Sequence, residues 1–476
     1  MNNQEHTSTL SASPSSSEDY FAQRQLKQGA VGWLLLIGLG VAYVISGDFA
    51  GWNFGIAQGG WGGMFVATTI VAFMYLCLCL SMSEMATMLP TAGGGYSFAR
   101  TAFGPLGGYL TGTAILIEYA IAPAAIATFI GAYCESLFGI GGWQVYLACY
   151  LIFMGIHLKG AGEALKIIFA ITLVAAIALA VFIFAMFPHF SMHNLFDIPA
   201  GQQRGASSFL PYGYLGIWAA VPYAIWFFLA VEGVPLAAEE AKDPAKSLPR
   251  GLIGAMLILT AFAMLILFLG AGAAGASALQ HSGAPLVDAL VKVYGQGTWL
   301  ANFVNFVGLA GLVASFFSII YAYSRQIFAL SRAGYLPTSL SLTNQNKAPY
   351  LAIIIPGIIG FLLSLTKEGD LLILIAVFGA TISYVLMMLS HIKLRLSRPL
   401  MHRPYKTPGG IFTSGIALIL AAIAVIAGFL VNPKVWCIAA TIYVLFIGYF
   451  MFYSRHHLIQ GTPEEEFAHL KSNEQE

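Results

Sequence analysis

An aspartate lies inside the first apolar stretch of the chain. Residues 45–60 read ISGDFAGWNFGIAQGG, and Asp48 falls within an apolar segment that begins near Val31. An ionised carboxylate at this depth in a membrane costs roughly 2.5 to 3.5 kcal/mol or more, so it usually faces a cavity and a partner. Asp48 is therefore a candidate for binding a cation. The alternative is that Asp48 joins two helices through a polar neighbour.

Glycines at positions 47, 51 and 55 surround this aspartate. Each glycine lowers helix stability by about 1 kcal/mol relative to alanine and permits non-helical backbone angles. The pattern predicts an interrupted helix, and freed backbone groups at such a break can face a water-lined cavity in a transporter. The alternative is that the glycines only allow close helix packing.

A second interruption is expected in residues 226–251, where Glu232, Gly233 and Pro235 fall inside an apolar span. Proline lacks a backbone donor and clashes with the carbonyl four residues earlier, so a regular helix cannot pass through it. Two interrupted helices in corresponding halves of a chain are a pointer to a transporter site.

The composition identifies an integral membrane protein. Hydrophobic residues make up 58% of the 476 positions and charged residues 9%, against about 25% charged in globular proteins. A net charge of +1 gives no reason to expect a nucleic-acid partner, so the expected surroundings are the lipid bilayer. The five cysteines and the histidines lack metal-ligand spacing, and no metal site is expected.

Apolar stretches of about twenty residues predict an all-α polytopic protein with twelve transmembrane helices. The expected spans are 31–59, 63–89, 106–138, 141–158, 164–188, 212–240, 250–278, 298–331, 349–366, 369–391, 411–431 and 433–454. If the N-terminus is cytoplasmic, eighteen Lys and Arg fall on the inner side and four on the outer side. Positively charged loops stay inside, so both termini are expected in the cytoplasm.

The spans pair into two halves of five helices, and an odd number gives the halves opposite membrane topology. The chain is then expected to consist of six consecutive segments. These are a disordered cytoplasmic tail (1–30), a first repeat (31–188), an extracellular loop (189–211), a second repeat (212–396), helices 11 and 12 (411–455) and a cytoplasmic tail (456–476).

Four motifs resemble those of the amino acid-polyamine-organocation (APC) permeases. They are EMATMLPTAGGGYSFARTAFGPLGGYLTG from Glu84, AAEEAKDPAKSLPRG at 237–251, SRQIFALSRAGYLP at 324–337 and RPYKTPGG at 403–410. ISGDFAGWNFG and TAILIEYAIAPAAIA are similar to the ethanolamine permease branch. The resemblance implies a five-plus-five inverted repeat with discontinuous helices 1 and 6, followed by two C-terminal helices. It also implies a substrate bound at the two breaks and alternating access.

Amino acid members of this family commonly place glycine, a small residue and glycine at the first break, where backbone amides receive a carboxylate. Here the corresponding residues are Gly51, Trp52 and Asn53. Together with Asp48, this departure disfavours a carboxylate and favours an amine, because unit charges 4 Å apart attract by roughly 4 kcal/mol at an effective dielectric near 20. Ethanolamine fits, with its ammonium near Asp48 and its hydroxyl near Asn53 or a freed carbonyl.

The resemblance assigns further residues. Trp226 corresponds to a tryptophan that covers the substrate in related antiporters, although it could instead be ordinary core. Phe228 is a second aromatic residue expected to contact the substrate, since aromatic faces attract an ammonium ion. Tyr119 corresponds to an aromatic residue of helix 3 placed against the substrate. Glu118 could act in gating or proton coupling, or bridge helices, and Glu232 could gate, titrate or stay neutral beside the broken backbone.

The expected function is import of ethanolamine across the inner membrane by a secondary transporter, with an amino acid permease or exchanger as the alternative. The sequence offers no catalytic constellation or phosphate-binding loop, so we expect neither an enzyme nor a cofactor. A gradient or exchange must then drive transport, with H⁺ or Na⁺ as the possible coupling ion. The protein could be a monomer or a homodimer.

Overall fold

The computed structural model describes residue 29 and residues 31–459. Most of the two predicted tails, 1–30 and 456–476, therefore lies outside the described residues. Within the described part, regular structure is helical apart from two isolated β-bridges. The all-α prediction is confirmed.

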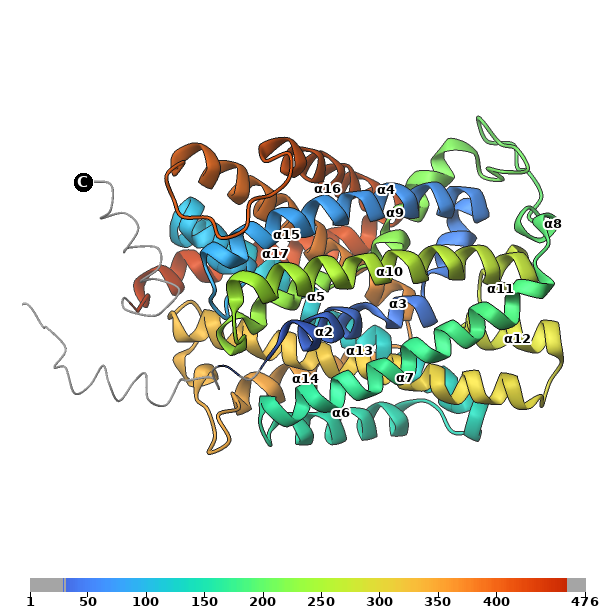
Figure 1. Ribbon diagram of the computed structural model, residues 1–476, viewed down its shortest axis with the longest axis horizontal. Helices are drawn as coiled ribbons and strands as arrows, with labels where there is room; N and C mark the ends of the chain where they lie inside the picture. The colour runs from blue at the N-terminus through green and yellow to red at the C-terminus, as the bar shows by residue number, and fades with distance from the viewer. Residues whose placement is uncertain (1–28, 30, 460–476) are drawn as a thin grey trace, which may run out of the picture.

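The helices run mainly along the long axis of the molecule (Figure 1). The elements that form the bundle are α2 (Trp33–Val44), α3 (Ser46–Phe49), α4 (Asn53–Met88), α5 (Gly95–Phe138), α6 (Trp143–His157), α7 (Ala161–Met186), α9 (Gly213–Trp226), the 3₁₀ helix η2 (Val231–Glu240), α10 (Pro244–Ala274), α13 (Trp299–Arg332), α14 (Tyr350–Ser364), α15 (Gly369–Ser397), α16 (Ile411–Val431) and α17 (Pro433–Phe452). Shorter elements at the ends of the bundle are η1 (Phe187–His189), α8 (Met192–Leu195), α11 (Ala276–Leu279), α12 (Pro285–Tyr294), η3 (Thr338–Ser341) and η4 (Ser454–His456).

Nine helical segments of the described chain are long and apolar enough to cross a membrane, and α2, α6 and α14 are shorter apolar helices. These twelve overlap the twelve predicted spans. Large apolar side chains on the outside of the bundle, such as Phe184 at 78% and Phe412 at 76% exposure, suit contact with lipid rather than water. The chain is a multi-pass membrane protein.

Two glycines interrupt long helices close to the predicted boundaries of the spans. The backbone of α4 leaves helical angles at Gly60 (φ 69°), where the first predicted span gives way to the second. The backbone of α5 does so at Gly104 (φ 79°), so a helical segment precedes the third predicted span, which was expected to begin at residue 106. Glycine tolerates these positive φ angles without steric cost.

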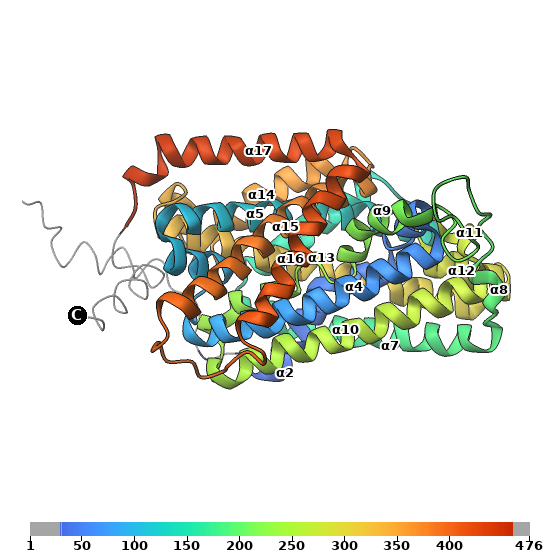
Figure 2. The same cartoon turned by 90° about the horizontal axis from the view of Figure 1, so that it is seen from above.

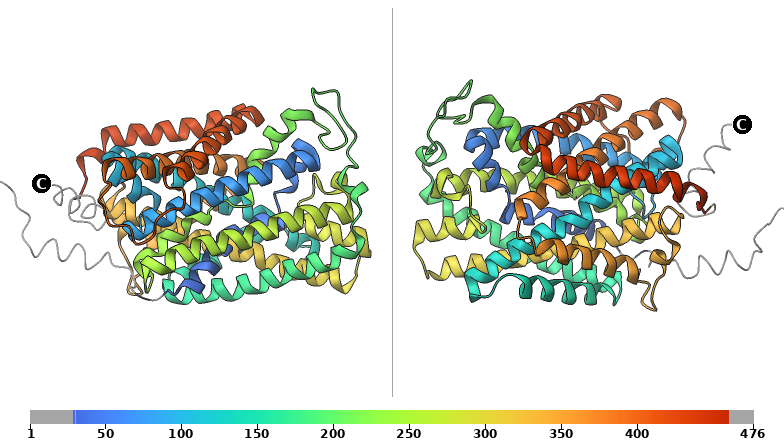
Figure 3. Two further views of the ribbon diagram at one scale, coloured as in Figure 1. Left: turned by 45° about the horizontal axis from the view of Figure 1, so that its top comes forward. Right: turned by 180° about the vertical axis from the view of Figure 1, so that it is seen from behind.

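Loop segments gather at the two ends of the bundle (Figure 3). One end holds residues 196–212 together with α8, α11 and α12. The amphipathic helix α12 was not predicted; its apolar face is buried through Leu286 and Leu290. At the other end, the Ile459 N–H donates to the Ala333 carbonyl, and the Val31 N–H donates to the Glu240 carbonyl. Both ends of the described chain therefore lie at the same end of the bundle.

The centre of the bundle is made by helices from distant parts of the sequence. Helix α5 packs along α15, and α4 packs along α9. Helix α17 lies along one side of the bundle (Figure 2), with Phe452 at its end 87% exposed. The division into two repeats at 31–188 and 212–396 stays a prediction.

Candidate site at two interrupted helices

The first break lies between α3 and α4. Ala50 is extended (φ −158°, ψ 158°) and Gly51 has φ 97°, after which α4 begins at Asn53. A Cβ atom on Gly51 would come within 2.6 Å of the Trp226 indole nitrogen. Position 51 thus needs glycine both for its backbone angle and for the close approach of an aromatic ring. The predicted interruption of the first span is confirmed.

The second break lies between α9 and η2. Helix α9 ends at Trp226, and Ala230 adopts a left-handed conformation (φ 76°) before η2 begins. The predicted interruption within residues 226–251 is confirmed. The chain leaves the α-helix at residues 227–230, and Glu232, Gly233 and Pro235 follow within the 3₁₀ helix η2.

The two breaks touch. The Trp226 indole N–H donates to the Ala50 carbonyl at 3.0 Å. A Cβ on Gly47 would lie 2.5 Å from the Trp226 carbonyl oxygen, so this glycine allows the two backbones to meet. The Trp226 side chain lies between the two breaks and is buried there, with 2% of its surface exposed.

Asp48 lies on α3, two residues before the extended residue Ala50 of the first break. Its side chain is fully buried, and neither carboxylate oxygen has a hydrogen-bond partner among the described residues. A buried carboxylate without a partner is costly unless a cation lies beside it. Asp48 is therefore available to a cationic ligand.

The side chains of Trp52 and Asn53 contact different parts of the protein. The Trp52 ring stacks on Phe227, with centroids 6.0 Å apart and planes 18° apart. The Asn53 amide donates to the carbonyls of Leu279 and Ser282, both at 2.8 Å, and its oxygen accepts from the Gly51 N–H at 3.2 Å. Asn53 thus ties the start of α4 to the loop around α11, and its predicted contact with a substrate hydroxyl stays a prediction.

An aromatic layer flanks the breaks. The Phe129 ring meets Trp226 edge-on at 6.4 Å, and Phe54 lies 6.3 Å from Phe129. Tyr223 meets Phe54 edge-on at 6.2 Å. These rings, from α4, α5 and α9, cover the breaks on the side of the α11 loop.

A second group of predicted residues lies around two buried carboxyl groups. Glu118 and Tyr119 come from α5 and Glu232 from η2, and all three are almost fully buried. The Tyr119 hydroxyl donates to Glu232 Oε1 at 3.3 Å. The Glu118 and Glu232 carboxyl groups lie close enough for their charges to interact, but neither Glu118 oxygen has a hydrogen-bond partner among the described residues. Among the described residues, no ion pair joins either carboxyl group to a Lys, Arg or His side chain.

Phe228 belongs to the second break, within residues 227–230. Its ring is 5.4 Å from that of Tyr75, whose hydroxyl hydrogen-bonds the Tyr384 hydroxyl at 2.7 Å. Tyr384 in turn interacts with Glu232. The structure therefore places Asp48, Gly51, Trp52, Asn53 and Trp226 at the breaks. Glu118 and Glu232 form the carboxyl pair, and Tyr119 lies beside it.

Tyr75 and Tyr384 were missed by sequence reasoning, as were Ser46 and Ser315. The Ser46 and Ser315 hydroxyls are 2.8 Å apart, and Ser315 donates to the Tyr43 carbonyl at 2.7 Å. The only sign of these four residues in the sequence is that each carries a hydroxyl group inside an apolar span. Tyrosines and serines are too common in packed membrane helices for that signal to single these residues out.

Four ion pairs among the described residues join helices at the end of the bundle where the chain ends lie. Glu84 accepts from Arg395 and from Arg403, each at 2.9 Å. Glu240 pairs with Arg325 at 3.3 Å. Glu239 pairs with Arg332 at 2.7 Å. Glu84, Glu239, Glu240 and Arg325 all belong to the motifs that resemble those of the APC permeases, and in this structure they form ion pairs.

Comparison with known proteins shows that one family matches most of the chain. The family described as amino acid permease matches residues 31–452. The chain is 28% identical to an uncharacterized transporter of Rhizobium meliloti over 82% of this chain and 85% of that protein. It is 26% identical to a branched-chain amino acid permease of Bacillus subtilis, over 89% of this chain and 92% of that protein. It is 24% identical to an aromatic amino acid transport protein of Salmonella typhimurium, over 89% of this chain and 95% of that protein.

Proposed function

This chain belongs to the amino acid permease family of the APC superfamily, and from that premise we propose that it imports ethanolamine by alternating access. The observation that carries the proposal is Asp48, a buried carboxylate without a hydrogen-bond partner among the described residues, beside the first helix break. A primary ammonium ion would supply the missing charge and up to three hydrogen-bond donors.

The residues after Asp48 support an amine without a carboxylate. The Gly51 N–H donates to the Asn53 side chain, so this amide is engaged by the protein itself. Trp52 fills the neighbouring position with a bulky ring. A carboxylate here would have to leave water beside Asp48 with fewer free donors to receive it, and selectivity would come from repulsion as well as attraction.

Trp226 would cover the bound amine. Its ring lies against the first break through the bond to Ala50, and aromatic faces attract ammonium ions by roughly 0.5 to 2 kcal/mol. In this account Phe228 and Tyr119 line the path between Trp226 and the carboxyl pair. Opening the contact between the two breaks would release the substrate.

Glu118 and Glu232 are the proposed coupling or gating residues. Two interacting carboxyl groups without a nearby cation are a suitable place to hold a proton. H⁺ is accordingly the first coupling ion to test, with Na⁺ as the second. The excess of Lys and Arg on one side supports cytoplasmic termini in the inner membrane.

An amino acid permease is the second candidate function. It is favoured by the relatives in Bacillus subtilis and Salmonella typhimurium, whose names specify branched-chain and aromatic amino acids. The two functions differ in whether the substrate carries a carboxylate.

Uptake of radiolabelled ethanolamine into proteoliposomes tests the proposal. Ethylamine should compete, whereas serine, alanine and arginine should compete at least about thirtyfold less well, which corresponds to about 2 kcal/mol. Choline tests whether bulk on the nitrogen is tolerated. Uptake of serine or alanine as readily as ethanolamine would replace the amine transporter with an amino acid permease.

A further inference from the structure

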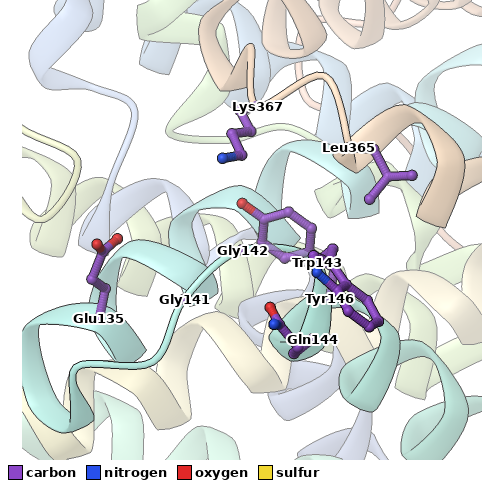
Figure 4. Close-up of a pocket in the computed structure, with 8 residues that line it drawn as sticks. All are labelled: Glu135, Gly141, Gly142, Trp143, Gln144, Tyr146, Leu365 and Lys367. Carbon is purple, nitrogen blue, oxygen red and sulfur yellow. The ribbon is translucent and has the colours of Figure 1, made fainter.

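A pocket opens beyond the aromatic layer that covers the breaks. Its volume is about 300 Å³, and its lining includes the carboxylates of Glu135 and Asp370 and the ammonium group of Lys367. A neighbouring pocket of about 470 Å³ shares Glu135, Tyr146 and Lys367 with it. Figure 4 shows these three side chains among the residues that line the larger pocket. We call the two pockets together the vestibule.

The floor of the vestibule is the aromatic layer itself. Phe54 and Phe129 line the smaller pocket, and Phe129 contacts the Trp226 ring that is bonded to Ala50. One layer of rings therefore separates the vestibule from the first helix break. A solute that reaches the breaks from this side would pass through the vestibule first.

The charges of the vestibule favour a cation. Two carboxylates and one ammonium group leave it with a net charge of −1 among its lining side chains. Asp370 is the more buried of the two carboxylates, because it is partly buried whereas Glu135 is exposed. A concave site with one excess charge and low-dielectric walls raises the local concentration of the opposite charge.

The walls also offer aromatic faces. Tyr146 lines both pockets, and the negative charge of Glu135 acts on it. Phe129 presents a second ring beside Asp370. Carboxylates next to aromatic rings suit a small organic ammonium ion, since its charge meets the carboxylate and its carbon atoms meet the ring.

We propose that the vestibule is an entry site for small primary ammonium ions, held by Glu135 and Asp370 above the closed aromatic layer. The inference rests on the proposed function, because the same cation would move on to Asp48 once the layer opens. Lys367 limits the attraction, and its removal should strengthen cation binding.

A cysteine in the wall reports on occupancy of this site. Gln144 lines the larger pocket and is exposed, so Gln144→Cys should react with a neutral maleimide. The labelling rate is measured in lipid nanodiscs against rising ethanolamine, with sodium chloride at equal ionic strength and with neutral 1-propanol. Labelling of the protein without the new cysteine is subtracted, because the chain has native cysteines.

Ethanolamine should slow the labelling, and sodium and propanol should not. Replacing both carboxylates, as Glu135→Gln with Asp370→Asn, should raise the half-protecting concentration about three- to tenfold, as expected for partly exposed charges. Each single variant should give part of that change. Lys367→Met should lower the half-protecting concentration, an opposite shift that misfolding would not produce.

Asp48→Asn separates the vestibule from the central site. Protection that persists in Asp48→Asn supports a distinct entry site, whereas protection lost in that variant would overturn the inference. Protection that is absent, or unchanged by the carboxylate variants, would also overturn it. Uptake is scored separately, so protection without ethanolamine uptake would refute the proposed function alone, and uptake without protection would refute the vestibule alone.

Discussion

The Trp226 indole N–H and the Ala50 carbonyl oxygen are 3.0 Å apart, and this hydrogen bond joins the two interrupted helices. The bond is buried, and the residues it connects are 176 positions apart in the sequence. The carbonyl is available because the backbone of Ala50 is extended rather than helical. A side chain at the second break thus supplies the hydrogen bond that a backbone carbonyl at the first break lacks.

Trp226→Phe and Trp226→Leu separate the two roles of this side chain. Phenylalanine keeps an aromatic face but loses the hydrogen bond, worth about 0.5 to 1.5 kcal/mol, whereas leucine loses both bond and face. Ethanolamine affinity in equilibrium binding should fall in the order Trp, Phe, Leu, with leucine weaker by a few kcal/mol at most. Equal affinity for all three proteins would make Trp226 a packing residue only.

Gly51→Ala should destabilise the protein. The side chain would require left-handed backbone at φ 97° and would come within 2.6 Å of the Trp226 indole nitrogen. The backbone conformation alone costs roughly 1 to 2 kcal/mol. Thermal unfolding in detergent should show a lowered midpoint.

Gly448→Ala is the matched control for this glycine. It lies in α17, and a Cβ atom there meets nothing within 4 Å. Its midpoint should stay at or above that of the wild type, because alanine favours the helix. A midpoint for Gly51→Ala as high as that of the control would contradict the steric account of the first break.

Asn53→Ala should loosen the loop around α11. It removes two hydrogen bonds to the Leu279 and Ser282 carbonyls, each worth about 0.5 to 1.5 kcal/mol. Hydrogen exchange across residues 275–284 should become faster. The control is Asn346→Ala, which removes an exposed bond to Leu158 in another loop. Unchanged exchange at residues 275–284 in Asn53→Ala would show that Asn53 does not hold this loop.

Glu118→Gln and Glu232→Gln test the carboxyl pair. If this pair carries the coupling proton, an inward proton gradient should accelerate ethanolamine uptake by the wild type and leave both variants unaffected. Tyr119→Phe removes the hydroxyl that donates to Glu232 but keeps both carboxyl groups, so its uptake should still respond to the gradient. Variants that respond as the wild type does would remove the pair from proton coupling.

The sequence predicted the spans and the first break well because both depend on local composition. Apolar runs bounded by charges specify membrane helices, and three glycines around Asp48 weaken one of them. The second break falls in the predicted range 226–251, but the residue at which it starts was not predicted, because Pro235 is conspicuous in the sequence, whereas Ala230 gives no sign that it adopts a left-handed conformation.

Long-range contacts were beyond sequence reasoning. The partners of Asn53 lie 226 and 229 residues away, and Tyr75 meets Tyr384 across 309 residues. Such pairs are fixed by how helices pack, and the residue types alone fit many partners. The residues that could be named in advance were those whose burial in an apolar span is costly, such as Asp48, Glu118 and Glu232.

The central claim is that Asp48 binds the ammonium group of the substrate, and equilibrium binding of radiolabelled ethanolamine to purified wild type and Asp48→Asn tests it most directly. Asparagine keeps the size of the side chain but removes its charge, so the high-affinity ethanolamine site should be lost while the unfolding midpoint stays near that of the wild type. Ethanolamine affinity in Asp48→Asn equal to that of the wild type would contradict the account.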